Sequence, residues 1–254
     1  MTAAIAIDPR SLRTGPPPLS EQSVHVWLIP ADEWTLGVAV LDRDEVARAA
    51  RLRDPLQQRR FAAVYASVRW ILGGYLRTDP DAVRFERAAC MRCGQRHGKP
   101  ALRQTDLLRF NLSRRDGFGL LALATACELG VDIEAAHRAR RMHELWPMIA
   151  SRDEFAHWGR RRSGSRAAAD SALRLWTRKE SVVKALGVGL ALDLTSFSIA
   201  SEADANGWRS VVGTVDATYV LDLSVAPGYL GAIAVCGEPR SVSLFRLRTA
   251  SGAR

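Results

Sequence analysis

The chain has 254 residues, and its 36 basic against 27 acidic side chains give a formal net charge of +9. That charge favours an anionic partner (a nucleic acid, a phosphorylated small molecule or an acidic protein), although the base composition of a gene can produce the same excess. No apolar run reaches the roughly 18 residues of a membrane span and the first residues lack a secretion signal, so we expect a cytoplasmic protein with no membrane partner. Four cysteines are too few for a disulfide scaffold of this size.

The first part of the chain is predicted to contain one strand and two helices. Residues 1–20 include the sequence TGPPPLS and are expected to form a flexible tail. Residues 24–30 alternate in the manner of a strand, and Asp44 is a candidate N-cap for a helix over 45–53. A second helix is predicted over 56–76, where apolar residues recur at helical spacing.

The middle of the chain is predicted to form strands joined by tight turns. Residues 107–113 indicate one strand. The next two apolar segments, 118–126 and 129–134, are expected to pair with each other around a turn at Cys127 and Glu128.

The last part of the chain is predicted to be helical first and then rich in strands. A strong helix over 171–187 is expected to end at Gly187 as its C-cap, with four or five strands beyond residue 194. This mixed order favours the α+β class. We expect an N-terminal lobe over residues 21–117 and a C-terminal lobe over residues 118–254.

Carboxylates and lysines in two segments draw attention to possible chemistry. The segment LGVDIE places Asp132 and Glu134 on one face of a strand, about 6.5 Å apart along the chain, where they repel unless a cation lies between them. In the helix WTRKESVVKALG, Glu180 and Lys184 are spaced i and i+4, which by itself also describes a surface ion pair. Lys179 falls on the apolar face of that helix, so it needs a partner or an opening to water.

Together, the three carboxylates suggest a metal site. Asp132, Glu134 and Glu180 would offer three oxygen ligands, a set that suits Mg²⁺. Such an ion would relieve the repulsion and bind a pyrophosphate, and Lys184 would lie near the same phosphates. The chain has no GxxxxGK[ST] loop, so any phosphate must be held in another way.

Four short motifs follow one another along the chain, namely HGKP (97–100), FNLS (110–113), GVDIE (130–134) and WTRKESVVKALG (176–187). In this order they closely resemble the signature of 4'-phosphopantetheinyl transferases of the Sfp type. The resemblance implies an α+β fold of two similar lobes in a pseudo-dimer, each with an antiparallel sheet and helices. It also implies an active site between the lobes, so we expect a monomer.

The resemblance implies the reaction and its catalytic residues. Coenzyme A and an acidic apo carrier protein of the polyketide or nonribosomal peptide type would be the substrates, with Mg²⁺ as cofactor. The 4'-phosphopantetheine arm would move to a carrier serine, releasing 3',5'-ADP. Asp132, Glu134 and Glu180 would match the metal ligands. Glu180 would also accept the serine proton, directly or through a metal-bound water, and Lys184 would stabilise the leaving phosphate.

The resemblance also implies residues that contact coenzyme A. Lys99 and Pro100 in the GKP motif and Ser113 in FNLS would match such contacts. Arg48 and Arg60, on the predicted first helices, are further candidates, for which the alternative is a solvated helix face.

One position departs from the family pattern. The family usually continues FNLS with histidine, whereas here Arg114 follows. Arginine is permanently charged and can bind phosphate through two parallel hydrogen bonds, so we expect coenzyme A binding to be kept. The affinity should fall less between about pH 6 and pH 8 than it would with histidine.

Three further features leave alternatives open. Cys90, Cys93 and His97 can form a structural zinc site or simply a turn that leads into GKP. Glu154 either supports the acidic cluster or caps its own helix. The basic segment 159–170 either steers an acidic carrier protein or is a solvated insertion.

Two other functions compete with the transferase. A nucleic-acid-binding protein fits the charge, but it would need a basic stripe with interleaved aromatic residues, which the sequence lacks. A magnesium-dependent nuclease or phosphatase fits Asp132 and Glu134, but not the joint presence of GKP, FNLS and WTRKE. The prediction is therefore a transferase without a nucleic-acid partner.

Overall fold

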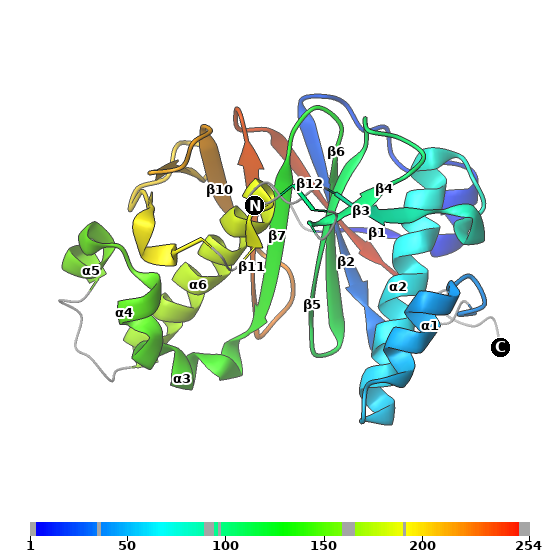
Figure 1. Ribbon diagram of the computed structural model, residues 1–254, viewed down its shortest axis with the longest axis horizontal. Helices are drawn as coiled ribbons and strands as arrows, with labels where there is room; N and C mark the ends of the chain where they lie inside the picture. Colours follow the sequence, from blue (N-terminus) through cyan, green and yellow to red (C-terminus); the bar gives the residue numbers. More distant parts are fainter. Residues whose placement is uncertain are drawn as a thin grey trace.

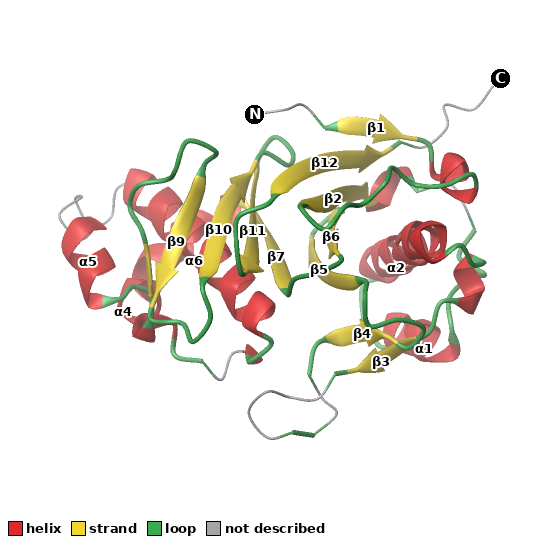
Figure 2. Cartoon of the chain, turned by 90° about the horizontal axis from the view of Figure 1, so that it is seen from above, coloured by secondary structure: helices red, strands yellow, loops and turns green. Residues whose placement is uncertain are grey.

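The computed structural model describes residues 4–34, 37–88, 94–95, 98–158, 166–189 and 192–248. It contains two five-stranded sheets, each covered on its outer face by one long helix (Figure 1). Seen from above, the two sheets lie next to each other between these helices (Figure 2). The predicted α+β class is confirmed.

The first sheet combines strands from both ends of the chain. Its members are β1 (Ile5–Ile7), β2 (Ser23–Pro30), β5 (Arg109–Arg115), β6 (Phe118–Ala124) and β12 (Ser241–Leu247). They lie in the order β1-β12-β2-β6-β5. Strand β6 runs antiparallel to both β2 and β5, whereas β12 runs parallel to both β1 and β2, so this sheet is mixed rather than wholly antiparallel.

Helices and short elements complete the first lobe. They are α1 (Arg43–Ala50), α2 (Pro55–Leu76), the antiparallel pair β3 (Phe85–Arg87) and β4 (Pro100–Leu102), and the 3₁₀ turns η1 (Pro9–Arg13), η2 (Ala31–Glu33) and η3 (Pro80–Ala82). The apolar side of α2 packs on β2 and β6 and forms the core of this lobe.

The N-cap of α1 differs from the prediction. Asp42, not Asp44, caps this helix, because the Asp42 side chain accepts the Glu45 N–H at 2.9 Å. The Glu45 carboxylate accepts the Asp42 N–H at 3.0 Å in return, which completes a capping box. The start of α2 follows the prediction closely, since the Asp54 side chain accepts the Leu56 N–H.

In its described residues, the second lobe has an antiparallel sheet and four α-helices. Its elements are β7 (Leu129–Ala135), β8 (Ser198–Ile199), β9 (Trp208–Val212), β10 (Thr218–Leu223), β11 (Tyr229–Cys236), α3 (Ala139–Met142), α4 (Trp146–Ile149), α5 (Arg152–Trp158), α6 (Arg166–Leu186), and the 3₁₀ turns η4 (Ala136–Arg138), η5 (His143–Leu145) and η7 (Leu194–Ser196). The strand order is β7-β11-β10-β9-β8, and every neighbouring pair is antiparallel.

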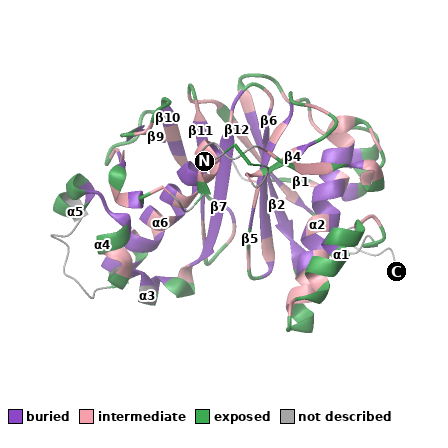
Figure 3. Ribbon diagram, viewed as in Figure 1, coloured by how far each residue is buried: buried purple, intermediate pink, exposed green. Residues whose placement is uncertain are grey.

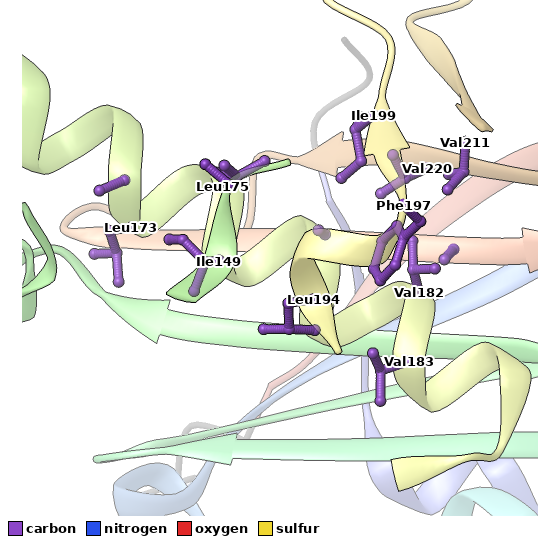
Figure 4. Packing of buried hydrophobic residues seen from close by; sticks show 14 of the residues in the cluster. Ile149, Leu173, Leu175, Val182, Val183, Leu194, Phe197, Ile199, Val211 and Val220 are labelled. Carbon is purple, nitrogen blue, oxygen red and sulfur yellow. The ribbon is translucent and has the colours of Figure 1, made fainter. Parts of the chain in front are cut away.

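The long helix α6 organises the core of the second lobe. Figure 4 shows Val182 of α6 beside Phe197, with Val220 nearby, in this core. Gly187 follows the helix with a positive φ and donates its N–H to the Val183 carbonyl, which confirms the predicted C-cap.

Lys179 lies fully buried in α6 and has a complete set of partners. Its ammonium lies 2.6 Å from the Glu154 carboxylate and donates to the carbonyls of Leu194 and Phe197. Glu154 also accepts the Ser151 N–H at 2.8 Å, which confirms that it caps α5. Burial lowers the pKa of Lys179. This pair therefore joins α5, α6 and the segment before β8, and Glu154 has a structural role.

A third core fills the space between the two sheets. Alternate residues of β2 and β6 enter it, together with Leu129, Val131 and Ile133 of β7. Figure 3 shows these central strands buried. Because side chains alternate along a strand, the residues between them in β7 face the other way, toward α6.

Three expectations, about strand pairing, the lobes and the N-terminal tail, are corrected. Strand β6 pairs with β2 and β5, and β7 pairs with β11, so these two strands belong to different sheets instead of pairing with each other. An alternating hydrophobic pattern indicates on which face of the sheet each side chain lies, but it does not indicate which strand is the neighbour. The lobes divide after β6 rather than between residues 117 and 118, and β12 belongs to the first sheet although it lies near the end of the chain. Part of the expected flexible tail forms β1 and η1.

Candidate active site

Strand β7 carries Asp132 and Glu134 on the face that looks toward α6. Their exposed fractions are only 5% and 2%. The strand approaches the helix so closely that a Cβ at Gly130 would lie 2.2 Å from the Ser181 carbonyl oxygen. Glycine at this position therefore allows the two elements to touch, and the carboxylates come to lie beside the side chains of α6.

Strand β5 presents alternate side chains to β7. Asn111 Oδ1 accepts a backbone N–H of β7 at 3.0 Å, and the Ser113 hydroxyl donates to Asp132 Oδ1 at 2.9 Å. Arg115 donates to Glu134 Oε1 at 2.8 Å. Because β5 and β7 belong to different sheets, this row of contacts joins the two lobes at the acidic residues.

Lys184 and Glu180, one turn apart on α6, complete the cluster. The Lys184 ammonium lies 2.6 Å from Asp132 Oδ1 and also donates to the Ser113 hydroxyl. Glu180 Oε1 is buried and has no hydrogen-bond partner within the described chain. Burial raises the pKa of Glu180 and of Asp132; the charge of Glu134 adds to both effects, and that of Lys184 opposes them.

The cluster offers two open oxygens to a metal ion. Asp132 Oδ2 and Glu180 Oε1 are buried without a partner among the described residues, and carboxylate oxygens suit Mg²⁺. Glu134 differs, because Arg115 and Arg138 both donate to it at 2.8 Å. Across the described ranges, no three His, Cys, Asp or Glu side chains are arranged to hold a metal, so the expected three-ligand set is not assembled.

These groups line a cleft of about 790 Å³ between the two lobes. The first lobe contributes residues of α1, α2 and β5, and the second contributes residues of β7 and α6. Of the predicted site residues, the cleft brings together Arg48, Pro100, Ser113, Arg114, Asp132, Glu134, Glu180 and Lys184.

Arg48 and Arg114 form a cationic wall of this cleft. The rings of Phe61 and Tyr65 stack with their centres 4.2 Å apart. The Arg114 guanidinium lies 4.7 Å from the centre of Phe61, and the Arg48 guanidinium lies 5.1 Å from the centre of Tyr65. Within the part of the chain that the structure describes, neither arginine pairs with a carboxylate, so their charge is available to an anionic ligand.

Two predicted coenzyme A contacts do not line the cleft. Lys99 forms an ion pair with Glu128, and its ammonium lies 3.4 Å from the Ala185 carbonyl at the end of α6. Arg60 pairs with Asp32 at 2.6 Å. Each side chain is thus committed to a partner of its own in this structure.

Two other predicted features cannot be placed. Cys90, Cys93 and His97, the candidate zinc ligands, lie outside the described residues, and so do residues 159–165 of the basic segment. The end of that segment, from Arg166, forms the first turn of α6.

The sequence contains signals for site residues that were not predicted. Arg115 follows Asn111 and Ser113 at a spacing of two in FNLSRR, and this spacing places all three side chains on one face of β5. Phe61 and Tyr65 have the i, i+4 spacing of a helical core stripe. In the structure Phe61 is buried, and both rings also contact a guanidinium group at the cleft.

Comparison with known proteins gives the family of this chain. Residues 128–234, which include all of β7 and α6, match the 4'-phosphopantetheinyl transferase superfamily. Among solved structures, the holo-ACP-synthase from Plasmodium yoelii matches over 43% of this chain and 92% of its own, with 15% identity and a TM-score of 0.36. Of the described helices, none is long and apolar enough to span a bilayer.

Relatives match the chain over most of its length. The 4'-phosphopantetheinyl transferase HetI of Nostoc sp. is 30% identical over 228 residues, which cover 86% of this chain and 90% of the relative. The phosphopantetheinyl transferase of Thraustochytrium sp. is 27% identical over a match that covers 71% of this chain and 67% of the relative. The 4'-phosphopantetheinyl transferase Sfp of Bacillus subtilis is 26% identical over a match that covers 66% of this chain and 69% of the relative. The match to HetI extends over both lobes, and we conclude that this chain belongs to the 4'-phosphopantetheinyl transferase family.

Proposed function

We propose that this chain transfers the 4'-phosphopantetheine arm of coenzyme A to a serine of an acidic apo carrier protein and releases 3',5'-ADP. The observation that carries the proposal is the cleft between the lobes, which is lined by Glu180 and Lys184 of the second lobe and by Arg48 and Arg114 of the first. Coenzyme A is a long anion with a pyrophosphate and a separate phosphate group. A cleft with one acidic, metal-binding end and one cationic wall suits both the pyrophosphate and the separate phosphate group.

Arg48 and Arg114 would bind a phosphate group of coenzyme A. Guanidinium groups bind phosphate through paired hydrogen bonds, and the rings of Phe61 and Tyr65 hold both arginines in place. Ser113 would lie beside the pyrophosphate, since its hydroxyl already contacts the Lys184 ammonium.

Glu180 and Lys184 would carry the proton and charge of the transfer. The serine oxygen would attack the phosphorus atom that bears the pantetheine arm, and the bond from that atom to the bridging oxygen would break. The bridging oxygen keeps the electron pair and leaves as part of 3',5'-ADP. The Glu180 carboxylate would accept the serine proton, and Lys184 would stabilise the departing phosphate.

Asp132 and Glu180 would hold Mg²⁺ through their open oxygens. A bound ion would neutralise part of the negative charge of the pyrophosphate. Lys184 adds a fixed positive charge at the same place, because Asp132 holds its ammonium at 2.6 Å. Glu134 lies beside these carboxylates and is paired with Arg115 and Arg138.

The choice of carrier forms part of the proposal. The net charge of +9 supports an acidic partner, and the resemblance to the Sfp type supports carriers of polyketide or nonribosomal peptide synthases. If the basic segment steers the carrier, neutralising Arg160, Arg161 and Arg162 slows association mainly at low salt. An unchanged association rate would reject that steering role. Since both lobes contribute to one cleft, we also propose that the enzyme acts as a monomer.

Intact-mass measurement of carrier proteins tests the proposed function. Apo carriers of the polyketide, nonribosomal peptide and fatty-acid types are incubated with the chain, coenzyme A and Mg²⁺, and each carrier is then weighed. We expect a gain equal to one phosphopantetheine arm with the wild type and none with Glu180→Gln. The absence of any gain across all the carriers would contradict the proposal.

A further inference from the structure

We infer that Glu134 anchors Arg115 and Arg138 in this chain rather than ligating a metal, so that two protein carboxylates, Asp132 and Glu180, hold the divalent cation. The inference rests on the proposed function in one respect, namely that a divalent cation binds in the cleft. It concerns which side chains of the acidic cluster touch that ion.

Both oxygens of Glu134 are already committed. Arg115 Nη2 donates to Oε1 at 2.8 Å, and Arg138 Nη1 lies 2.8 Å from both Oε1 and Oε2. The Glu134 side chain is only 3% exposed, so its partners face little competition from water. Two guanidinium groups around one carboxylate leave a local charge of about +1, which repels a cation.

The two partners of Glu134 come from different lobes. Arg115 lies on β5 of the first sheet, while Arg138 follows Glu134 by four residues in the turn after β7. Freeing Glu134 for a metal would break charge-assisted hydrogen bonds from both sides and leave two cations without their partner. This arrangement gives Glu134 a mechanical role, because it ties β5 to the end of β7.

Asp132 and Glu180, unlike Glu134, each have a carboxylate oxygen without a hydrogen-bond partner among the described residues. One oxygen of Asp132 is held by Lys184 and Ser113, while Oδ2 is buried and has no partner in the described chain. Glu180 Oε1 is likewise without a partner there. Two such ligands would leave about four positions of an octahedral ion for water and substrate phosphate.

The test uses Mn²⁺ as the probe and a charge-balanced variant, Glu134→Gln/Arg138→Gln. Removing one negative and one positive charge keeps the local charge constant, so a change in Mn²⁺ affinity reports on ligation. We expect an affinity within about threefold of the wild type for this variant, and a loss of about tenfold or more for Asp132→Asn and Glu180→Gln. Electron paramagnetic resonance of free Mn²⁺ measures the affinity.

The hydration of bound Mn²⁺ provides a second readout that does not depend on affinity. Water-proton relaxation should give about four inner-sphere waters in both the wild type and the charge-balanced variant without coenzyme A. One additional water in the variant, or a tenfold loss of Mn²⁺ affinity, would overturn the inference. Circular dichroism checks that the variant folds, and Glu134→Gln/Arg115→Gln replaces it if it does not.

The same titration separates the inference from the proposed function. If the wild type binds no Mn²⁺ yet still modifies a carrier, the inference fails while the transferase proposal survives. If the wild type binds Mn²⁺ but modifies no carrier, the transferase proposal fails while the ligand assignment is still decided by the variants.

Discussion

Gly130 of β7 faces Ser181 of α6 at a distance that leaves no room for a side chain, since a Cβ would lie 2.2 Å from the Ser181 carbonyl oxygen. This close approach brings the strand that carries Asp132 against the helix that carries Lys184. Strand β7 and helix α6 can therefore form the acidic side of the cleft together because the β7 residue at their contact is glycine.

Gly130→Ala should therefore separate the strand from the helix. The added methyl group would overlap backbone atoms, which cannot rotate away, and overpacking of this kind costs about 3 kcal/mol of unfolding free energy. Urea denaturation measures this cost. Gly37→Ala is the matched control, since nothing lies within 4 Å of a Cβ at Gly37, and its effect should stay within about 0.5 kcal/mol. Equal stability of the two variants would show that the close approach is not required.

Glu180→Gln should abolish transfer yet stabilise the metal-free protein at neutral pH. Burial, together with the charge of Asp132, raises the pKa of Glu180 above its ordinary value of 4.5. A carboxyl whose pKa is raised in the folded state makes the protein lose stability as pH rises from the ordinary value through the raised one. The wild type in EDTA should therefore lose more stability than Glu180→Gln between about pH 4.5 and pH 7. A variant less stable than the wild type at pH 7 would mean that Glu180 is a structural residue.

Lys184→Gln should reduce kcat by about 100-fold or more with a smaller change in the KM for coenzyme A, because its charge is used chiefly on the departing phosphate. The substitution also deprives Asp132 of its ion-pair partner. Steady-state kinetics with an apo carrier measures both parameters. A rise in KM at unchanged kcat would assign Lys184 to substrate binding alone.

Arg114→His should make coenzyme A affinity depend on pH. The guanidinium of Arg114 stays charged at all relevant pH values, whereas a histidine loses its charge between about pH 6 and pH 8. Calorimetric titration with coenzyme A should show a nearly constant dissociation constant for the wild type over this range. The dissociation constant of the variant should increase with pH, and an unaltered profile would count against a phosphate contact at this position.

Glu154→Gln should destabilise the protein by about 3–5 kcal/mol, since it leaves the buried Lys179 ammonium without its counter-ion. Because burial lowers the pKa of Lys179, the amine loses its proton more easily when folded, and the deficit should narrow as pH rises from about 7 to 9. Denaturant melts at several pH values measure this deficit. The double variant Glu154→Gln/Lys179→Met should recover part of the loss; no recovery would show that the ion pair is not its cause.

Much of the site could be predicted from local pattern. The period of two along a strand placed Asp132 and Glu134 on one face, and the period of a helix placed Lys184 one turn beyond Glu180, as the structure has them. The same period of two along β5 predicts that Arg115 lies on the same face as Ser113.

Other features depend on contacts that a local pattern does not contain. Alternation in β6 and β7 indicates strands but cannot tell that they join different sheets, and nothing local tells that β12 returns to pair with β2. The pairing of Lys99 with Glu128 and that of Arg115 with Glu134 also arise from tertiary neighbours.

The amount of 3',5'-ADP released per carrier modified tests most directly whether the cleft transfers the arm of coenzyme A rather than hydrolysing it. In a single turnover with apo carrier and Mg²⁺, we predict equal amounts of 3',5'-ADP and phosphopantetheinyl carrier, and no release when the carrier serine is replaced by alanine. Release of 3',5'-ADP without a modified carrier would contradict transfer and indicate a hydrolase.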